Sequence, residues 1–254
     1  MQSQFDWPVR PPAPLRSASP FAHDVARRFD LEIGDIQAAA TQSIDSTHAI
    51  DAILPAPGQV TLLTGASGSG KSTLLRATTA HAMRTGVRAL DLQTLKLSTN
   101  RCQRVVDSID APTLDERLRC LSRVGLAEAW TWLRRPSELS EGQAWRLRLA
   151  LAIHRASARQ SSASHAGKGP SVANDRTSTP STLLVCDEFA ALLDRVTAIV
   201  VARALRHAVD ASDGQLRVIV VTSHDDLTAA LQPDVSVRCD FGSIRVTRRS
   251  EVQP

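Results

Sequence analysis

The chain has 254 residues, enough for one large domain or two small ones at roughly 150 residues per domain. Hydrophobic residues make up 43% and charged residues 22%, which are ordinary globular values that exclude a wholly disordered or fibrous chain. Apolar runs stay well below the ~18 residues of a membrane span, and the N-terminus lacks the apolar segment of a secretory signal. We therefore expect a soluble protein of the cytoplasm.

The net charge is +4 and the pI is near 9.2, which raises the question of nucleic-acid binding. The basic residues are scattered among 26 acidic ones, so the charge alone is a weak argument for a nucleic-acid surface. The four cysteines are far apart and form no CxxC pair, which indicates neither a disulfide framework nor a zinc site. They are Cys102, Cys120, Cys186 and Cys239.

Two segments have the composition of irregular chain. Residues 1–27 contain five prolines, and we expect a flexible arm there. The segment Ser157–Thr182 is rich in Ser, Ala, Gly and Thr without a hydrophobic period, which predicts a disordered insertion. We assign residues 28–250 to one domain that contains this insertion.

The patterned remainder of the chain alternates between strands and helices. Strands are predicted at Val60–Leu63, Val87–Leu92, Leu183–Cys186 and Val218–Val221. Helices are predicted at Ser72–Thr85, at Thr113–Leu133, from Ser140 onward and at Asp194–Val209. The segment Val235–Val246 alternates around Asp240-Phe241-Gly242, as a hairpin does. This order predicts an α/β fold, with a mainly parallel sheet flanked by helices.

A glycine-rich segment follows directly after the first predicted strand. It fits the pattern G-x-x-x-x-G-K-[ST] and comprises Gly65, Ala66, Ser67, Gly68, Ser69, Gly70, Lys71, Ser72 and Thr73. Glycines let backbone N–H groups turn toward phosphate oxygens, and a following helix N-terminus favours negative charge. Lys71 would supply positive charge to the β- and γ-phosphates, and Ser72 a hydroxyl to Mg²⁺. The segment therefore predicts nucleotide binding.

Two more groups of polar residues follow predicted strands. Asp187 and Glu188 come directly after Leu183–Cys186, and His224 comes shortly after Val218–Val221. Because the carboxyl ends of parallel strands share one edge of a sheet, we expect all three near the glycine-rich segment. Asp187 would hold Mg²⁺ through its water shell, and Glu188 would accept a proton from an attacking water. The alternatives are a solvated strand end for the acidic pair and an exposed side chain for His224.

Residues 139–143 read LSEGQ and open a predicted helix. With Ser140 as the N-cap and Gln143 three residues later, the segment would form a capping box, which explains both residues. A capping box does not explain Gly142, because glycine is a poor helix former.

With LSEGQ between the glycine-rich loop and the acidic pair, the chain resembles the ABC-type ATPases, whose signature has the form LSGGQ. The resemblance covers about Gly58–Leu231 and includes the motifs in family order. These are the Walker A loop, the signature, the Walker B strand with Asp187 and Glu188, a D-loop that ends at Asp194, and the switch His224. LSEGQAWRLRLALA and DEFAALLDRVTA are closest to stand-alone soluble ABC ATPases, a group related to members fused to predicted acetyltransferase domains.

The resemblance implies a P-loop NTPase fold of the ABC type, with a short helical subdomain at about residues 99–140. It implies Mg²⁺-dependent ATP hydrolysis by a homodimer that forms on ATP binding and acts on a protein or nucleic-acid partner. The residues implied in catalysis are Lys71, Glu188 and His224, with Ser72 and Asp187 on the metal. The signature residues Ser140, Gly142 and Gln143 would contact the ATP bound by the other protomer.

Departures from the family pattern leave alternatives open. Glu141 replaces a glycine of the signature, and both Gln93 and Gln103 are candidates for the Q-loop. The alternative function is the ATP-binding subunit of a membrane transporter.

The lack of a clear Q-loop and the short helical region speak against a transporter subunit, because those elements couple hydrolysis to membrane helices. A membrane permease is therefore the less favoured partner. A third possibility is a switch that binds ATP without hydrolysing it.

The family's adenine-stacking aromatic residue is not evident upstream of the phosphate loop. Aromatic residues are absent between Asp30 and Trp130, so Phe21 and Phe29 are the upstream candidates. The sequence does not decide between them.

Overall fold

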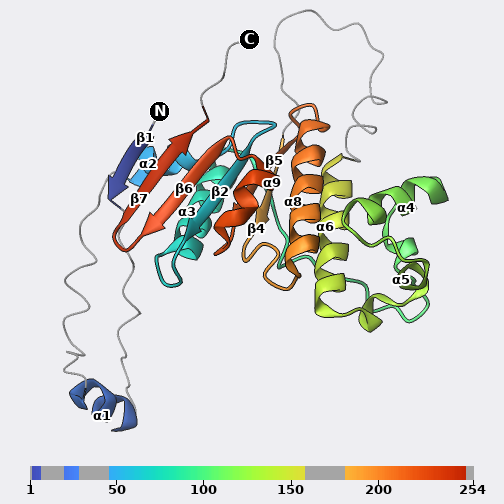
Figure 1. Cartoon of the computed structure of the whole chain (residues 1–254), viewed down its shortest axis with the longest axis horizontal. Helices are drawn as coiled ribbons and strands as arrows, with labels where there is room; N and C mark the ends of the chain where they lie inside the picture. The colour runs from blue at the N-terminus through green and yellow to red at the C-terminus, as the bar shows by residue number, and fades with distance from the viewer. Residues whose placement is uncertain (1, 7–19, 29–45, 158–180, 250–254) are drawn as a thin grey trace, which may run out of the picture.

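A seven-stranded sheet runs through the computed structural model, which describes residues 2–6, 20–28, 46–157 and 181–249 (Figure 1). The strand order is β1-β7-β6-β2-β5-β4-β3. The strands are β1 (Gln2–Asp6), β2 (Val60–Gly65), β3 (Arg88–Asp91), β4 (Thr182–Cys186), β5 (Leu216–Val221), β6 (Val235–Asp240) and β7 (Ser243–Arg248). The described helices of eight residues or more are α1 (Pro20–Arg28), α2 (Ser46–Ile53), α3 (Lys71–Arg84), α4 (Leu114–Arg123), α6 (Glu141–Ser157) and α8 (Arg195–Asp210).

The sheet is mainly parallel, as the alternation of strands and helices predicts. Strand β2 pairs in parallel with both β5 and β6, and β4 pairs in parallel with both β3 and β5. The pairs of β7 with β6 and with β1 are antiparallel. The carboxyl ends of β2, β5 and β4 therefore lie next to one another at one edge of the sheet, with β5 in the middle.

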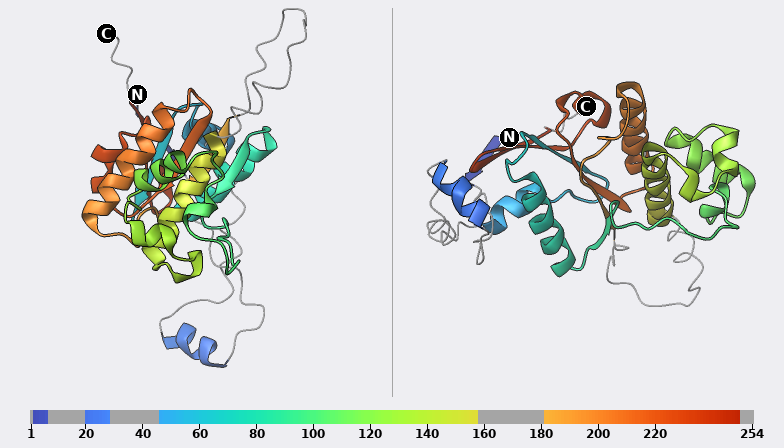
Figure 2. Two further views of the ribbon diagram at one scale, coloured as in Figure 1. Left: turned by 90° about the vertical axis from the view of Figure 1, so that its right-hand side faces the viewer. Right: turned by 90° about the horizontal axis from the view of Figure 1, so that it is seen from below.

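Helices cover both faces of the sheet (Figure 2). Alternate residues of β5 show this most directly, because Val218 and Val220 belong to a buried cluster with α6, α8 and the short helix α9 (Thr228–Leu231). Ile219 and Val221 point the opposite way, into a second cluster with α2 and α3. This arrangement explains why β5 is apolar at almost every position.

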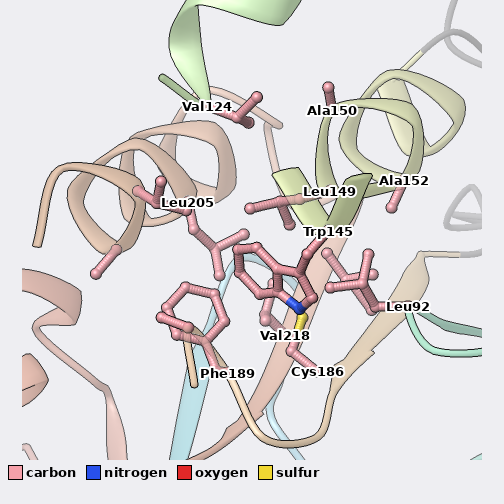
Figure 3. Packing of buried hydrophobic residues seen from close by; sticks show 14 of the residues in the cluster. Leu92, Val124, Trp145, Leu149, Ala150, Ala152, Cys186, Phe189, Leu205 and Val218 are labelled. Carbon is pink, nitrogen blue, oxygen red and sulfur yellow. The ribbon is translucent and has the colours of Figure 1, made fainter. Parts of the chain in front are cut away.

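An aromatic contact lies at the centre of the larger cluster (Figure 3). Trp145 of α6 meets Phe189, which follows β4, with ring centroids 5.2 Å apart and the rings inclined by 77°. Both side chains are almost fully buried, and such edge-to-face pairs contribute about 0.5–1.5 kcal/mol beyond the area they bury. The helix that LSEGQ opens is thus packed against the segment that carries the acidic pair.

The short helical region lies at the opposite end of the molecule from β1 (Figure 1). It contains α4, the five-residue α5 (Ala129–Leu133) and short 3₁₀ turns at Val106–Ser108 and Pro136–Glu138. The prediction of one helix over Thr113–Leu133 is wrong, because the chain turns at Gly125, whose φ is +78°. Among the described residues, no helix is both long and apolar enough to cross a membrane.

Two parts of the segment expected as a flexible arm are regular. Gln2–Asp6 forms β1 and pairs with residues 243–247 along the open edge of β7, and Pro20–Arg28 forms α1. The unpaired backbone groups at the edge of β7 provide partners for this strand, which the proline-rich composition of residues 1–27 does not predict. The sheet thus includes a strand from outside the expected domain of residues 28–250, and the rest of the arm lies outside the described residues.

The two end residues of the insertion expected at Ser157–Thr182 belong to regular elements. Ser157 closes α6, and Thr182 opens β4. Ser181 is buried, and its hydroxyl accepts a hydrogen bond from Arg217 Nε at 2.8 Å. Residues 158–180 lie outside the described residues, and their disorder stays a prediction.

Replacement of residues 158–180 by a short Gly/Ser linker is expected to leave the melting temperature within about 1 °C of the wild type, because the replaced composition offers little to bury. The matched control is Ser181→Ala, which removes the acceptor of Arg217 and should cost about 1 kcal/mol, or about 3 °C. Thermal unfolding followed by circular dichroism compares the two. A larger drop for the linker variant than for Ser181→Ala would show that the segment is part of the fold.

Candidate functional site

The carboxyl edge of the parallel strands borders a cleft of about 550 Å³. Three segments line it: the loop and helix start after β2, the residues after β4, and the end of β5. The lining residues are Ser67, Gly68, Gly70, Lys71, Ser72, Thr73, Arg76, Asp187, Glu188, Ala191, Val221, Thr222 and Ser223. The structure therefore brings the glycine-rich segment and the acidic pair together, although they are more than a hundred residues apart.

Gly65 fixes where the glycine-rich segment begins. Its φ is +139°, and a Cβ at this position would lie 2.2 Å from the carbonyl oxygen of Cys239 on β6. No side chain fits there, so β2 and β6 can approach each other only with glycine at this position. Burial raises the pKa of the Cys239 thiol to about 11, so this neighbour is neutral at physiological pH.

The side chain of Lys71 folds back over the glycine-rich loop that precedes it. Its Nζ donates hydrogen bonds to the carbonyl oxygens of Gly65 at 2.8 Å and Ala66 at 2.7 Å. A lysine ammonium group has three N–H donors, so one remains for a ligand. The loop itself turns through left-handed backbone at Gly68 and Gly70, whose φ angles are +79° and +90°. The charge of Lys71 is thereby held at the wall of the cleft.

Four charged side chains line the cleft, two of each sign. Lys71 and Arg76 are basic, and Asp187 and Glu188 are acidic. An anionic ligand placed beside the two carboxylates would be repelled unless a cation lay between them. Ser72 and Asp187 line the same cleft, and their oxygen atoms are of the kind that Mg²⁺ prefers, so the donor set fits this ion.

Arg76 is a lining residue that the motif analysis missed. It lies on α3, four residues after Ser72. Residues four apart share one face of a helix, so helical spacing alone points Arg76 toward the same side as Ser72. The pattern G-x-x-x-x-G-K-[ST] ends before this position, which is why the motif does not include it.

The backbone of the acidic segment is unusual. Glu188 and Ala190 have φ angles of +48° and +60°, in the left-handed region that non-glycine residues seldom adopt. The amide of Glu188 donates to Asp187 Oδ1 at 3.0 Å, and the amide of Phe189 donates to the Val221 carbonyl at 2.8 Å. These contacts hold the exposed Glu188 at the cleft while Phe189 enters the core. Such backbone outliers cluster at functional sites.

His224 follows the correct strand but does not line the cleft. The lining reaches Thr222 and Ser223, and the exposed His224 comes one residue later. Its backbone amide donates to the Thr222 hydroxyl at 3.1 Å, and the Thr222 amide donates to the Leu63 carbonyl at 3.1 Å. These bonds fix the end of β5 beside β2. Thr222 and Ser223 therefore line the cleft at the position where the sequence motif predicts the histidine.

The signature segment lies outside the cleft of its own chain. The amide of Gln143 donates to Ser140 Oγ at 3.3 Å and the amide of Ser140 donates to Gln143 Oε1 at 3.1 Å, so the capping box is present. A Cβ on Gly142 would lie 3.1 Å from the carbonyl oxygen of Leu192 and 3.3 Å from Leu193 Cδ2. Close packing against residues 192–193 therefore provides a reason for this glycine within one chain.

Asp194 is the N-cap of α8 and also lies outside the cleft lining. Its carboxylate accepts hydrogen bonds from the Thr197 amide at 3.0 Å and the Thr197 hydroxyl at 2.6 Å. The hydroxyl contact, followed by the amide contact, holds the pKa of Asp194 below its usual value. The two Q-loop candidates, Gln93 and Gln103, are not among the lining residues.

The protein thus has an α/β fold in which the glycine-rich segment and the acidic pair line one cleft. Residues 39–248 match the family described as Novel STAND NTPase 1 (nSTAND1), and the chain belongs to this family. A comparison with curated proteins found no match. The stand-alone ABC subgroup indicated by the motifs remains a prediction.

Three solved structures with a similar chain path are ATP-binding cassettes. One is a dimeric post-hydrolysis state of the cassette MJ0796 bound to ADP and Pi, with 18% identity over 74% of this chain and 84% of that chain and a TM-score of 0.46. A second is dimeric MJ0796, described as a bacterial ABC transporter cassette, with 17% identity over the same shares and a TM-score of 0.46. The ADP conformation of MJ1267, a cassette of an ABC transporter, has 16% identity over 77% and 82% and a TM-score of 0.47.

Two glycine substitutions test the close approach of β2 and β6. We expect Gly65→Ala to cost about 3 kcal/mol or more of the free energy of unfolding, because the new Cβ would collide with a backbone carbonyl. Gly68→Ala is the control, since its Cβ has ordinary contact distances and only the positive φ is unfavourable, at about 1 kcal/mol. Urea unfolding measures both. Equal costs would contradict the close contact at Gly65.

Proposed function

We propose that this protein binds ATP together with Mg²⁺ in the cleft and hydrolyses it to ADP and phosphate. The observation that carries the proposal is that Lys71 and Ser72 line the same cleft as Asp187 and Glu188, in a chain that belongs to an NTPase family. A merely glycine-rich turn does not require carboxylates from a distant strand at the same place.

The phosphates of ATP would lie against the loop after β2. Backbone N–H groups and side chains of this loop would bind them, from Gly65, Ala66, Ser67, Gly68, Ser69, Gly70, Lys71, Ser72 and Thr73. Lys71 and Arg76 bring positive charge to the cleft, and Ser72 and Asp187 would hold Mg²⁺. The ion would neutralise phosphate charge and polarise the γ-phosphoryl group.

Hydrolysis would use Glu188 as the general base. Its carboxylate accepts a proton from water while the water oxygen attacks the γ-phosphorus, and the bond to the bridging oxygen breaks to release ADP. Lys71 stabilises the charge that develops on the phosphoryl oxygens. His224 follows the lining residue Ser223 directly, and we propose that it approaches the γ-phosphate when ATP is bound.

The signature and the D-loop would act across a homodimer. Ser140, Gly142 and Gln143 lie outside the cleft of their own chain, so a head-to-tail second copy is what would bring them to a phosphate. Exposed apolar side chains near Asp194 support such an interface. Val196 and Val200 lie four residues apart on α8 and are 72% and 47% exposed, and Leu192, which precedes the helix, is 54% exposed.

We further propose that the dimer acts in the cytoplasm on a macromolecular partner, either a protein or a nucleic acid. The net charge of +4 is compatible with both classes. The two copies would close around ATP and separate after hydrolysis, and this movement would act on the partner.

Lys71→Ala tests nucleotide binding. The substitution removes the cation that faces the β- and γ-phosphates, and we expect the affinity for Mg-ATP to fall about tenfold to a hundredfold. Isothermal titration calorimetry gives the affinity. Lys96→Ala, which removes a lysine that is not among the lining residues of the cleft, is the control and should bind ATP as the wild type does. Equal affinities for Lys71→Ala and the wild type would contradict the site.

Glu188→Gln separates hydrolysis from binding. Glutamine keeps the size of the side chain but cannot take a proton, so turnover should fall about 100- to 10,000-fold while ATP binding survives. Without hydrolysis the protein should remain a dimer in Mg-ATP and be a monomer in ADP, as measured by light scattering. Undiminished turnover would exclude Glu188 as the base.

Ser140→Arg in the Glu188→Gln background tests the contact between protomers. The bulky arginine should abolish the ATP-dependent dimer while ATP binding by the monomer persists. Because Ser140 also caps α6, the control is Thr113→Arg, which removes the equivalent capping box of α4 and should leave the dimer intact. A dimer that persists in the Ser140→Arg variant would exclude a contact between protomers at Ser140, and LSEGQ would then serve only as a helix cap.

A further inference from the structure

The turn between β6 and β7 stands beside the phosphate loop. Strand β6 runs parallel to β2 with Cys239 opposite Gly65, so both strands end at the same edge of the sheet. Past this register, β2 continues into the loop and β6 into the turn at Phe241 and Gly242. The turn is held by the pairing of Asp240 with Ser243 at the end of the hairpin.

Phe241 lies at the rim of the cleft. Its Cε1 is 3.8 Å from the position that a Cβ of Gly68 would occupy, and Gly68 lines the cleft. The side chain is 71% exposed, so it is not part of the core. Among the described residues, the other exposed aromatic side chains are Phe21 and Trp130, and Figure 1 places the helix of Trp130, α5, far from the β6–β7 hairpin.

The order of the strands gives the direction in which a nucleotide would lie. Strands β5 and β4 are on one side of β2, and they bring Asp187, Glu188 and Thr222 to the cleft. The γ-phosphate reacts on that side in the proposed mechanism. Strand β6 is the other neighbour of β2, so the ribose and the base would leave the loop toward the hairpin that carries Phe241.

We propose that Phe241 stacks on the nucleobase of the bound nucleotide. The inference rests on the proposed function, and it adds the residue that recognises the base. It also accounts for the lack of an aromatic residue between Asp30 and the glycine-rich segment, because the ring would come from the C-terminal hairpin instead. Stacking uses the flat face of the base, and an exposed ring on a paired hairpin presents such a surface without rearrangement.

The test compares a nucleotide with its phosphate part alone. Mg-ADP and Mg-pyrophosphate are titrated calorimetrically into the wild type, Phe241→Ala and Phe241→Trp. We expect Phe241→Ala to bind ADP about tenfold more weakly and pyrophosphate as the wild type does, since only the base contact is lost. Phe241→Trp should retain the affinity for ADP, because tryptophan can also stack on the base. This variant shows whether the loss in Phe241→Ala comes from lost stacking or from a change in the hairpin. Phe21→Ala is the matched control and should bind both ligands normally.

Each other result overturns the inference. A Phe241→Ala variant that binds ADP normally, or that loses pyrophosphate and ADP equally, excludes stacking by this ring. Loss of ADP affinity in Phe21→Ala would assign the base to the N-terminal segment instead. Failure of the wild type to bind either ligand would contradict the proposed function itself, whereas the results above contradict only the role of Phe241.

Discussion

The site depends on how closely strand β2 is held between its two neighbours. On one side Gly65 approaches the Cys239 carbonyl so closely that a Cβ would collide with it, and on the other the Thr222 amide bonds to Leu63. The glycine-rich segment therefore begins at a strand end whose position is fixed from both sides. The same two neighbours carry the groups placed around the loop, Phe241 after β6 and Ser223 after β5.

A second set of contacts joins the acidic segment to the helix that LSEGQ opens. Trp145 packs edge-on against Phe189, the residue after Glu188, and Gly142 packs against the carbonyl of Leu192. A second protomer that touched the signature would press on the same segment that holds Glu188 at the cleft. The proposed dimer contact and the proposed general base therefore lie on segments that pack against each other, which fits the proposed coupling of dimerisation to hydrolysis.

Local patterns predicted much of this structure, and long-range contacts account for what they missed. The strand before the phosphate loop, the cap at Ser140 and the final hairpin each follow from neighbouring residues. The break at Gly125 was missed because apolar spacing continues through it. Strand β1 and the position of Phe241 depend on β7 and β6, which are distant in sequence from their partners, so no local pattern reports them.

In the proposed mechanism, the loop after β2 and the acidic pair after β4 hold one nucleotide together. A crystal structure of Glu188→Gln with Mg²⁺ and ATP is the decisive experiment. The triphosphate should lie against the amides of Gly68–Thr73, with the metal between Ser72 and Asp187 and the substituted side chain facing the γ-phosphate. A nucleotide bound elsewhere, or bound at the loop with its γ-phosphate directed away from Asp187, would contradict the proposed site.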